Sequence, residues 1–348
     1  MDAEMASWKS TDTYVDEVPP LGANIVSGMW IFRGVDYFQT FSPTPKMTTL
    51  WVLLHVAAHR DYKLHSLDFS TTLLQGRLHK EIWLRRPPGF TRSFPAGTQW
   101  SLRRPVYGLR QAPREWHDTV RTTLATLGFA PSTADPSLSF RTDTTLPPFY
   151  VLLYVDDLVF ATANTKALVH VKSELQKRHT CTYLGPSALR LHVLLATVHS
   201  SAYRSLALSS TFGRVPFWLA MWLPVDTESS SCEAEIYAGA MAAQELRWLT
   251  YLLTDLGEAP RSPPVLYVDN KAMIALCLEH RLEHRTKHIA LHYFLARELQ
   301  QRGQLRRAYV ASQANTADVF TKALQPCDHQ RFCTVLGLVP TVPHLLTS

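Results

Sequence analysis

The sequence predicts a mixed α/β protein with two domains, and three observations lead to that prediction. First, 348 residues are enough for about two domains, each with its own core. Second, 46% hydrophobic and 18% charged residues make a globular composition. Third, strand-like runs and helical periodicity occur on both sides of a central stretch that lacks a sustained period. We therefore expect an N-terminal tail over residues 1–24, a domain over 25–188, a junction without a regular pattern over 189–228, a second domain over 229–325 and a C-terminal tail over 326–348.

The spacing of apolar residues predicts the elements of the first domain. The residues from Thr48 to His59 are apolar at helical spacing, and Leu64–Phe69 has the composition of a strand. Pro113 suits the first turn of a helix, and Gly128 suits its end. Further along, the pattern predicts a β-hairpin over 149–161 and a helix over about 165–178.

Helix start and stop signals define the second domain. Ser230 and Glu233 form a capping box for a long amphipathic helix that ends at about Asp255. Asn315 is expected to cap a short final helix. Between them the sequence predicts strands at Val265–Val268 and Leu305–Val310, and helices at Lys271–Leu278 and about 286–301.

Charge and cysteine content bound the classes of function. The formal net charge of +6 with more Arg than Lys fits a nucleic-acid partner, although an Arg bias can equally reflect codon composition. The five cysteines form no CxxC pair, which favours a reducing compartment, and Cys327, His329 and Cys333 match no standard zinc spacing. The polar N-terminal residues and the lack of a long apolar segment predict a soluble, intracellular protein, cytoplasmic or nuclear, with no membrane partner.

The most informative stretch is Tyr154-Val155-Asp156-Asp157, in which two adjacent carboxylates lie between two apolar runs. Such runs on both sides of a short polar centre predict a hairpin with the acids at its tip. Acids so close repel each other unless a cation lies between them and a partner, and a divalent metal is the usual one. A solvated turn is the alternative, since Asp is common in turns.

Further acids occupy positions that suit metal-assisted phosphoryl chemistry. Two-metal transfer needs carboxylates from separate strands around ions about 3.5–4 Å apart. Asp68, which ends an apolar strand, is the best third acid of the first domain, with a strand-end cap as the alternative. In the second domain Glu235 lies in a helix, Asp269 ends a strand and Asp318 begins a helix. Glu233 competes with Glu235, and helix-dipole stabilisation is the alternative for Asp318.

Several segments of the first domain resemble, in order, the reverse transcriptase of copia-type LTR retrotransposons. The matching strings are Gly34–Tyr37 with Thr40–Pro43, Leu64–Asp68 with Leu74–Gly76, Pro87–Phe90, Tyr107–Trp116 and Tyr154–Asp157. Together they are highly specific and cover about 31–188. The resemblance implies the α+β palm of a right-hand polymerase, with truncated fingers and no thumb.

The resemblance also implies roles for particular residues. Asp68, Asp156 and Asp157 would bind Mg²⁺, with Mn²⁺ as the alternative ion. Gln111 would contact the incoming nucleotide and the template, and Tyr154 would lie near the primer terminus. On the residues alone, Gln111 is equally a polar cap of a helix and Tyr154 an ordinary strand residue. The implied partners are an RNA template, a DNA primer, an RNA–DNA hybrid and dNTPs, and the oligomeric state stays open.

Two departures from the family pattern concern substrate binding. The family usually has an aromatic residue at the position of Leu73, where it excludes a ribose 2′-OH, so discrimination between dNTP and rNTP is in doubt. The family also has a basic fingers segment before Gly34, whereas here Met29–Arg33 runs directly into that block. Without that segment the transferring phosphate loses electrostatic stabilisation.

The second domain resembles the RNase H domain of the same elements, which implies a partial RNase H-like α/β domain. The matching strings are Ser229–Glu235, Tyr267–Asn270, Arg285–Ile289 and Ala317–Lys322. By this resemblance Glu235, Asp269 and Asp318 would bind metal. Contacts to the nucleic-acid backbone would come from Arg285, Lys287 and His288, although a lone His is often structural. The family's first strands, which carry the first catalytic Asp, are expected to be missing, together with the thumb and connection regions.

Two functions from different classes follow. One is a truncated RNA-directed DNA polymerase with an RNase H remnant, which transfers a nucleotide from a dNTP to a primer 3′-OH. The other is a catalytically inactive retroelement relic that at most binds nucleic acid. The intact set of Asp68, Asp156 and Asp157 favours the enzyme, whereas the missing fingers, thumb and RNase H strands favour the relic.

Overall fold

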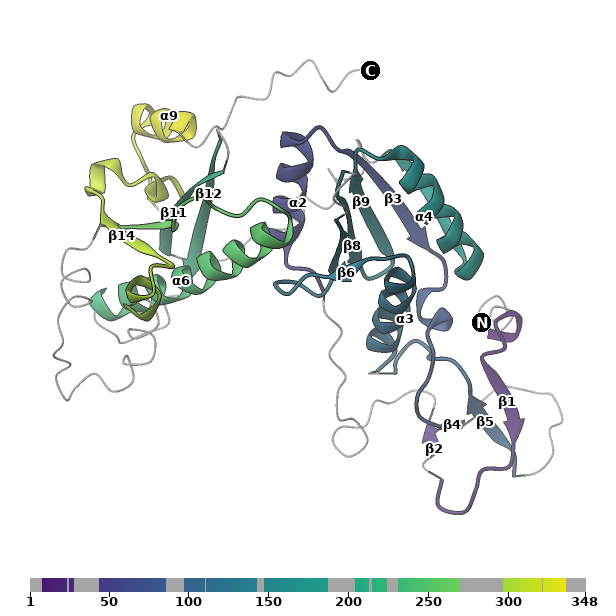
Figure 1. The fold of residues 1–348 in the computed structure, drawn as a ribbon. Helices are drawn as coiled ribbons and strands as arrows, with labels where there is room; N and C mark the ends of the chain where they lie inside the picture. The colour runs from purple at the N-terminus through teal and green to yellow at the C-terminus, as the bar shows by residue number, and fades with distance from the viewer. Residues whose placement is uncertain are drawn as a thin grey trace. The chain divides into compact units, whose positions relative to one another are not determined.

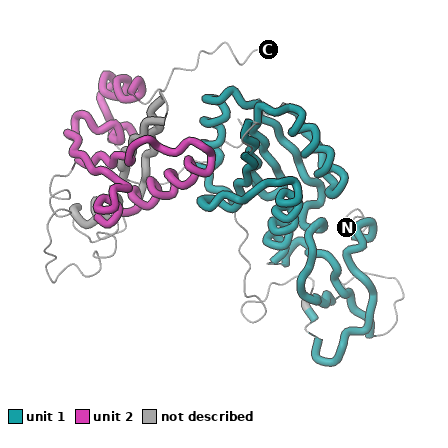
Figure 2. The backbone as a smooth tube through the Cα atoms, in the orientation of Figure 1, with its two compact units in different colours: residues 1–194 teal, residues 195–348 magenta. Residues whose placement is uncertain are grey.

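A computed structural model describes residues 8–23, 25–27, 44–85, 97–109, 111–142, 147–186, 204–212, 215–223, 231–269, 297–320 and 322–335, with the backbone alone for those between 204 and 238. The chain divides into two compact units, Met1–Leu194 and Leu195–Ser348 (Figure 2). Each unit combines helices with a sheet, as the predicted mixed α/β class requires. Within the described ranges, no helix is both long and apolar enough to cross a membrane.

A six-stranded antiparallel sheet with the order β10-β3-β9-β8-β7-β6 forms the centre of unit 1. Its strands are β3 (Lys63–Phe69), β6 (Ala130–Pro131), β7 (Leu138–Arg141), β8 (Phe149–Tyr154), β9 (Asp157–Thr162) and β10 (Cys181–Pro186). β8 and β9 consist mostly of aliphatic and aromatic residues, which suit a buried sheet. They pair along their whole length, and the hairpin predicted over 149–161 is therefore confirmed.

Local signals explain the helices of unit 1, which are α2 (Met47–His59), η1 (Thr72–Gln75), α3 (Ala112–Thr126) and α4 (Thr165–Arg178). α3 has Pro113 in its first turn and is followed by Gly128 at a φ of 83°. α4 begins after Asn164, whose side-chain Oδ1 accepts a hydrogen bond of 3.0 Å from the backbone N–H of Ala167. The three α-helices confirm the predictions from apolar spacing.

α3 and α4 cover one face of the six-stranded sheet (Figure 1). The core between them and the sheet contains Leu67 and Phe69 of β3, together with Trp116 of α3. Successive side chains of a strand point to opposite faces, so Asp68 points away from this core. The sheet thus separates the helix-covered core from the face that carries Asp68.

A smaller sheet with the order β1-β5-β4-β2 completes unit 1. Its strands are β1 (Tyr14–Glu17), β2 (Ile25–Ser27), β4 (Ile82–Arg85) and β5 (Gln99–Leu102). The prediction of a tail over residues 1–24 does not hold for Tyr14–Glu17, which pairs with Gln99–Leu102. The ring of Tyr14 packs 4.4 Å from that of Trp100, so this short segment covers a large buried side chain.

Unit 2 contains a four-stranded sheet with the order β12-β11-β13-β14. Its elements are β11 (Arg204–Phe212), β12 (Val215–Leu223), α6 (Ser231–Asp255), β13 (Val265–Val268), β14 (Arg306–Tyr309), η3 (Ser312–Ala314), η4 (Thr316–Phe320) and α9 (Pro326–Val335). The predicted strands at 265–268 and 305–310 and the long helix ending at Asp255 are confirmed. The predicted helix over Lys271–Leu278 lies outside the described residues.

Two expectations for unit 2 need correction. The junction predicted over 189–228 contains β11 and β12, an antiparallel hairpin whose first strand pairs with β13. The sheet partners expected to be missing are therefore present, although neither strand carries an Asp or Glu. The segment predicted as a C-terminal tail from 326 begins with α9, which buries Phe332.

Candidate functional site

The tip of the β8–β9 hairpin carries the two adjacent acids. β8 ends at Tyr154 and β9 begins at Asp157, so Val155 and Asp156 form the turn between them. Tyr154 and Asp157 pair across the hairpin, and Tyr154 is half-buried. The prediction that the acids lie at the tip is confirmed.

The neighbouring strand β3 brings the third predicted acid to the same place. Asp68 and Asp157 are direct partners in the β3–β9 register. Partners in an antiparallel pair share one face of the sheet, and their Cβ atoms lie about 4.5–5.5 Å apart. Like charges in such a pair destabilise the sheet. The fold therefore places Asp68 and Asp157 side by side on the face opposite α3 and α4, with Asp156 in the adjoining turn.

The electrostatics of Asp156 reflect this crowding. Partial burial raises the pKa of the Asp156 carboxyl above its usual value, and the charge of Asp68 raises it further. A hydrogen bond from the hydroxyl of Thr72 acts in the opposite direction by stabilising the carboxylate. The negative charges of Asp68 and Asp156 thus repel each other, and a cation between them would relieve that repulsion.

The backbone around the acids is held in an unfavourable conformation. Val155 has a φ of 54° and Thr71 a φ of 50°, a region that β-branched residues rarely adopt. The indole N–H of Trp116 donates a hydrogen bond of 2.9 Å to the carbonyl of Val155. The N–H of Phe69 donates one of 2.8 Å to the carbonyl of Asp156. Hydrogen bonds from α3 and β3 thus hold the turn that carries Asp156. Backbone strain of this kind is typical of functional sites.

The carboxylates at the hairpin tip suit an ion that takes only some of its ligands from the protein. Within the described ranges, no three His, Cys, Asp or Glu side chains converge in a ready metal-binding arrangement. Mg²⁺ usually binds one or two carboxylates and takes its other ligands from water and substrate phosphates. The facing carboxylates of Asp68 and Asp156 suit that mode of binding, because a divalent ion relieves their repulsion.

The other predicted residues of this domain lie in distinct environments. Leu73 lies in η1, is partly buried and packs against both hydrophobic cores of unit 1. Gln111 precedes α3 and is buried, but its side chain makes no capping hydrogen bond. Its Oε1 atom has no hydrogen-bond partner within the described structure. The alternative of a helix cap for Gln111 is therefore wrong, and its carbonyl oxygen remains available.

In unit 2, Asn315 links two of the predicted acids. Its Nδ2 atom lies 3.4 Å from Oδ2 of Asp269 and 3.3 Å from Oδ1 of Asp318. Asn315 also caps η4 as predicted, since its Oδ1 accepts the N–H of Ala317 at 3.2 Å. Lys322 forms an ion pair of 2.7 Å with Asp318, which is almost fully buried. Asp318 thus already has a cation within the protein.

Four predicted residues of unit 2 are described less fully. Glu235 lies in α6, and the structure describes its backbone but not its side chain. The predicted backbone contacts Arg285, Lys287 and His288 also lie outside the described residues. The structure therefore brings together Asp269 and Asp318 of the predicted set.

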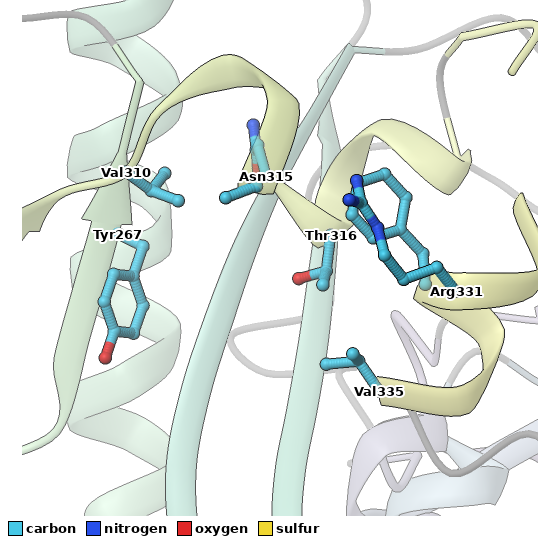
Figure 3. Close-up of a pocket in the computed structure, with 8 residues that line it drawn as sticks. Tyr267, Val310, Asn315, Thr316, Arg331 and Val335 are labelled. Atoms are coloured by element: carbon cyan, nitrogen blue, oxygen red, sulfur yellow. The ribbon is translucent and has the colours of Figure 1, made fainter. Parts of the chain in front are cut away.

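A pocket of about 340 Å³ lies beside Asn315 (Figure 3). Figure 3 shows Tyr267 and Val310 on one side of it and Arg331 and Val335 of α9 on the other. Neither Asp269 nor Asp318 lines this pocket. Its mainly apolar walls do not suit a metal ion, which needs charged or oxygen-rich ligands.

Sequence reasoning missed the contacts that four residues make at the two acid clusters. Trp116 ends one of the strings that resemble the family, and no pattern indicates that its N–H reaches the hairpin. Thr72 and Asn315 act through contacts that form only in the folded chain. Lys322 could have been found, because it follows Asp318 at the i, i+4 spacing that favours ion pairs.

Comparison with known proteins gives matches over most of the chain. A family described as "Reverse transcriptase (RNA-dependent DNA polymerase)" matches residues 12–204, which is more than half of the chain. The "Retrovirus-related Pol polyprotein from transposon RE2" of Arabidopsis thaliana is 28% identical, over 89% of this chain and 30% of that protein. The polyprotein from transposon TNT 1-94 of Nicotiana tabacum is 30% identical, over 47% of this chain and 12% of the relative.

A solved structure also matches, described as a foamy viral protease-reverse transcriptase in complex with double-stranded DNA. It is 12% identical and covers 72% of this chain and 58% of that chain, with a TM-score of 0.20. A TM-score this low supports no argument about the present chain.

The alignment with the RE2 polyprotein contains internal gaps. It extends over 436 residues, although the whole present chain has 348. The relative therefore contains residues within the aligned region that have no counterpart here. The present chain spans about 30% of the length of these Arabidopsis relatives.

Proposed function

Because the chain belongs to the reverse transcriptase family of copia-type retrotransposon Pol polyproteins, we propose that unit 1 is a polymerase palm that extends a DNA primer on an RNA template. The proposed reaction is nucleotidyl transfer from a dNTP to the primer 3′-OH. The observation that carries this proposal is the acid cluster at the hairpin tip, where Asp156 faces Asp68 and Asp157 pairs with Asp68.

Asp68, Asp156 and Asp157 would hold two divalent ions, either Mg²⁺ or Mn²⁺. When bound, such ions lower the pKa of the attacking hydroxyl and stabilise the charge on the transferring phosphate. The raised pKa of Asp156 supports this assignment, since its cause is burial and the nearby charge of Asp68. The strained turn at Val155, fixed from α3 and β3, keeps the two carboxylates close in spite of their repulsion.

Three further residues would position the substrates. Gln111 would contact the incoming nucleotide and the template, and its unpaired Oε1 atom supports a polar ligand. Leu73 would lie near the sugar of the nucleotide, where its shape sets the choice between dNTP and rNTP. Tyr154 would lie near the primer terminus, next to its cross-strand partner Asp157.

Primer extension by the purified chain on an RNA template with Mg²⁺ tests the polymerase. Asp156→Asn keeps the size of the side chain but removes its charge, and we expect the rate to fall by at least about 100-fold, since metal binding contributes several kcal/mol to such reactions. Asp61→Asn is the matched control, because Asp61 is exposed and its ion-pair partner among the described residues is the exposed Lys63. The control should extend as wild type does. Equal extension by Asp156→Asn and wild type would refute the proposal.

A second candidate is an inactive relic of a retroelement that at most binds nucleic acid. The internal gaps in the alignment with the RE2 polyprotein favour this alternative. The same assay separates the two, since a relic extends no primer at any concentration of Mg²⁺ or Mn²⁺.

For unit 2 we propose an RNase H remnant that does not cleave. Its acids would be Glu235, Asp269 and Asp318, but Lys322 already neutralises Asp318 and the described hairpin strands carry no acid. Arg285, Lys287 and His288 would contact an RNA–DNA hybrid through its backbone. Incubation with a labelled hybrid and Mg²⁺ should leave the RNA intact, and cleavage that Asp269→Asn abolishes would contradict this proposal.

A further inference from the structure

A groove of about 830 Å³ lies in unit 1 beside α3. Its walls come from the segment after η1, the turn after β5, one flank of α3 and the end of α4. Asp68, Asp156 and Asp157 do not line it. Since α3 and α4 cover the face of the sheet opposite Asp68, the groove is a surface separate from the acid cluster.

Positive charge from separate segments of the chain converges on this groove. The segment after η1, the turn after β5 and the end of α4 contribute four arginines, namely Arg77, Arg103, Arg104 and Arg178. The guanidinium group stays charged at every physiological pH and matches the geometry of phosphate oxygens. Four such groups exceed the needs of one phosphate ion and suit a polymer with repeated phosphates.

The two acids of the groove do not cancel this charge. Asp118 lies 3.5 Å from Arg114 and 3.6 Å from Arg121, two cations that are not part of the groove lining. Asp12 lies 3.6 Å from Arg103, but both side chains are more than half exposed. An exposed ion pair of this kind contributes little. The groove therefore keeps a net positive charge.

Hydrogen bonds hold two of the arginines in place. Nη1 of Arg104 donates to the carbonyl of Leu74 at 3.2 Å, and Nη1 of Arg178 donates to the hydroxyl of Thr126 at 2.6 Å. A guanidinium has five N–H donors in a rigid plane, so one internal bond orients the others. Arg178 also lies 3.7 Å from Glu174. Less conformational entropy is lost when a ligand binds side chains that are already oriented.

Gly76 allows the two basic segments to meet. A Cβ atom at this position would lie 2.8 Å from Cγ of Pro105 and 3.2 Å from the carbonyl of Leu73. Only glycine therefore lets the segment with Arg77 approach the segment with Arg103 and Arg104 this closely. The convergence of the arginines is thus built into the packing of the chain.

We propose that this groove binds the phosphodiester backbone of a single nucleic-acid strand, at a distance from the polymerase centre. Among the described residues its lining contains four arginines and no Phe, Tyr or Trp side chain, so contacts to phosphates outweigh stacking on bases there. Contacts to phosphates alone carry no sequence information. Binding at the groove is therefore independent of base sequence and strongly dependent on salt.

The test is fluorescence anisotropy with the full chain and a labelled 20-nucleotide oligo(dT) or oligo(U), in EDTA and without dNTP. We expect the Arg77→Gln/Arg103→Gln variant to bind about fivefold more weakly than wild type, because two exposed charge contacts are lost. The slope of log Kd against log salt should fall by about 0.7 for each lost phosphate contact. Both arginines are exposed, and circular dichroism should show an unchanged fold.

A matched control variant removes the same charge from the two flanking helices. Arg121→Gln/Lys177→Gln lies on α3 and α4 but outside the groove, and its affinity and salt slope should stay close to those of wild type. Equal weakening in both variants would overturn the proposal in favour of a general charge effect, and no weakening in either would also overturn it.

A competition experiment distinguishes a strand from a small phosphate. Unlabelled oligo(dT) should displace the probe at a far lower phosphate concentration than inorganic tripolyphosphate, whereas equal potency would contradict the assignment to a strand. Because the assay needs no catalysis, it can succeed with an inactive polymerase. It can also fail while primer extension is normal, so the two proposals stand or fall separately.

Discussion

The acid clusters of the two units differ in how their charge is balanced. In unit 1, Asp156 faces the carboxylate of Asp68, and that charge adds to partial burial in raising the pKa of Asp156. In unit 2, Asp318 has the ammonium group of Lys322 at 2.7 Å, and Asn315 donates to both Asp318 and Asp269. Repulsion in the first cluster favours the binding of a cation, whereas the second is satisfied by the protein itself.

This contrast shows that the position of an acid is a weak guide to its role. Asp68 lies near the end of β3, and Asp269 directly follows β13. What separates them is the set of contacts around each, which decides whether a charge is compensated. Perturbed carboxylates without internal compensation are the better candidates for function.

The largest effect should come from removing the positive charge that pairs with Asp318 in unit 2. Lys322→Met leaves Asp318 almost fully buried and without its cation, so we expect the free energy of unfolding of unit 2 to fall by about 2 kcal/mol. The value is at the lower end for a buried pair because half of the Lys322 side chain is exposed. Urea unfolding followed by circular dichroism measures it.

A double variant is the control for that measurement. Asp318→Asn/Lys322→Met removes both charges and should recover most of the lost stability, since no buried charge then remains unpaired. If Lys322→Met alone costs nothing, Asp318 does not depend on Lys322, and the contrast between the two units fails.

The next effect concerns the strained turn in unit 1. Trp116→Phe keeps an aromatic ring against Phe69, whose ring lies 4.8 Å away, but removes the N–H that donates to Val155. We expect primer extension to slow by about tenfold, because the loss of one hydrogen bond costs about 1 kcal/mol and lets Val155 leave its unfavourable φ. The concentration of Mg²⁺ needed for half-maximal rate should rise, since the carboxylates are then aimed less well.

Trp100→Phe is the control for this change. Trp100 is equally buried but belongs to the core of the smaller sheet of unit 1. It should lower stability without changing the Mg²⁺ dependence. A purely structural role for Trp116 would give the same result for both variants.

Regular elements could be predicted from sequence because their signals are local. Pro113 and Gly128 marked the bounds of α3, and apolar runs marked β8 and β9. The strand at Tyr14–Glu17 was missed because its partners lie about 85 residues away in sequence, at Gln99–Leu102. Short polar strands of this kind are stabilised by tertiary contacts rather than by intrinsic preference.

The acids themselves could be found from sequence, but their surroundings could not. The apolar runs beside Asp68, Asp156 and Asp157 and the family-like motifs around them identified these acids in the sequence. The register of β3 with β9 then pairs Asp68 with Asp157. The conformation of Val155, the bond from Trp116 and the buried Oε1 of Gln111 depend on packing between elements. No local pattern encodes contacts of that kind.

The smallest effect is the pH dependence of stability in unit 1. An acid with a raised pKa in the folded state binds its proton more tightly there than in the unfolded chain, so protonation stabilises the fold. This contribution is lost as the pH rises from the ordinary value of 3.8 through the raised pKa of Asp156. Wild type should therefore lose stability relative to Asp156→Asn as the pH rises from about 4 to 7.

Thermal midpoints of both proteins across that range, with and without Mg²⁺, measure the difference. Added Mg²⁺ should abolish it at neutral pH, because the ion replaces the proton between the carboxylates. A difference that does not vary with pH would mean that neither burial nor the charge of Asp68 raises the pKa of Asp156. The contrast with unit 2 would then rest on Lys322 alone.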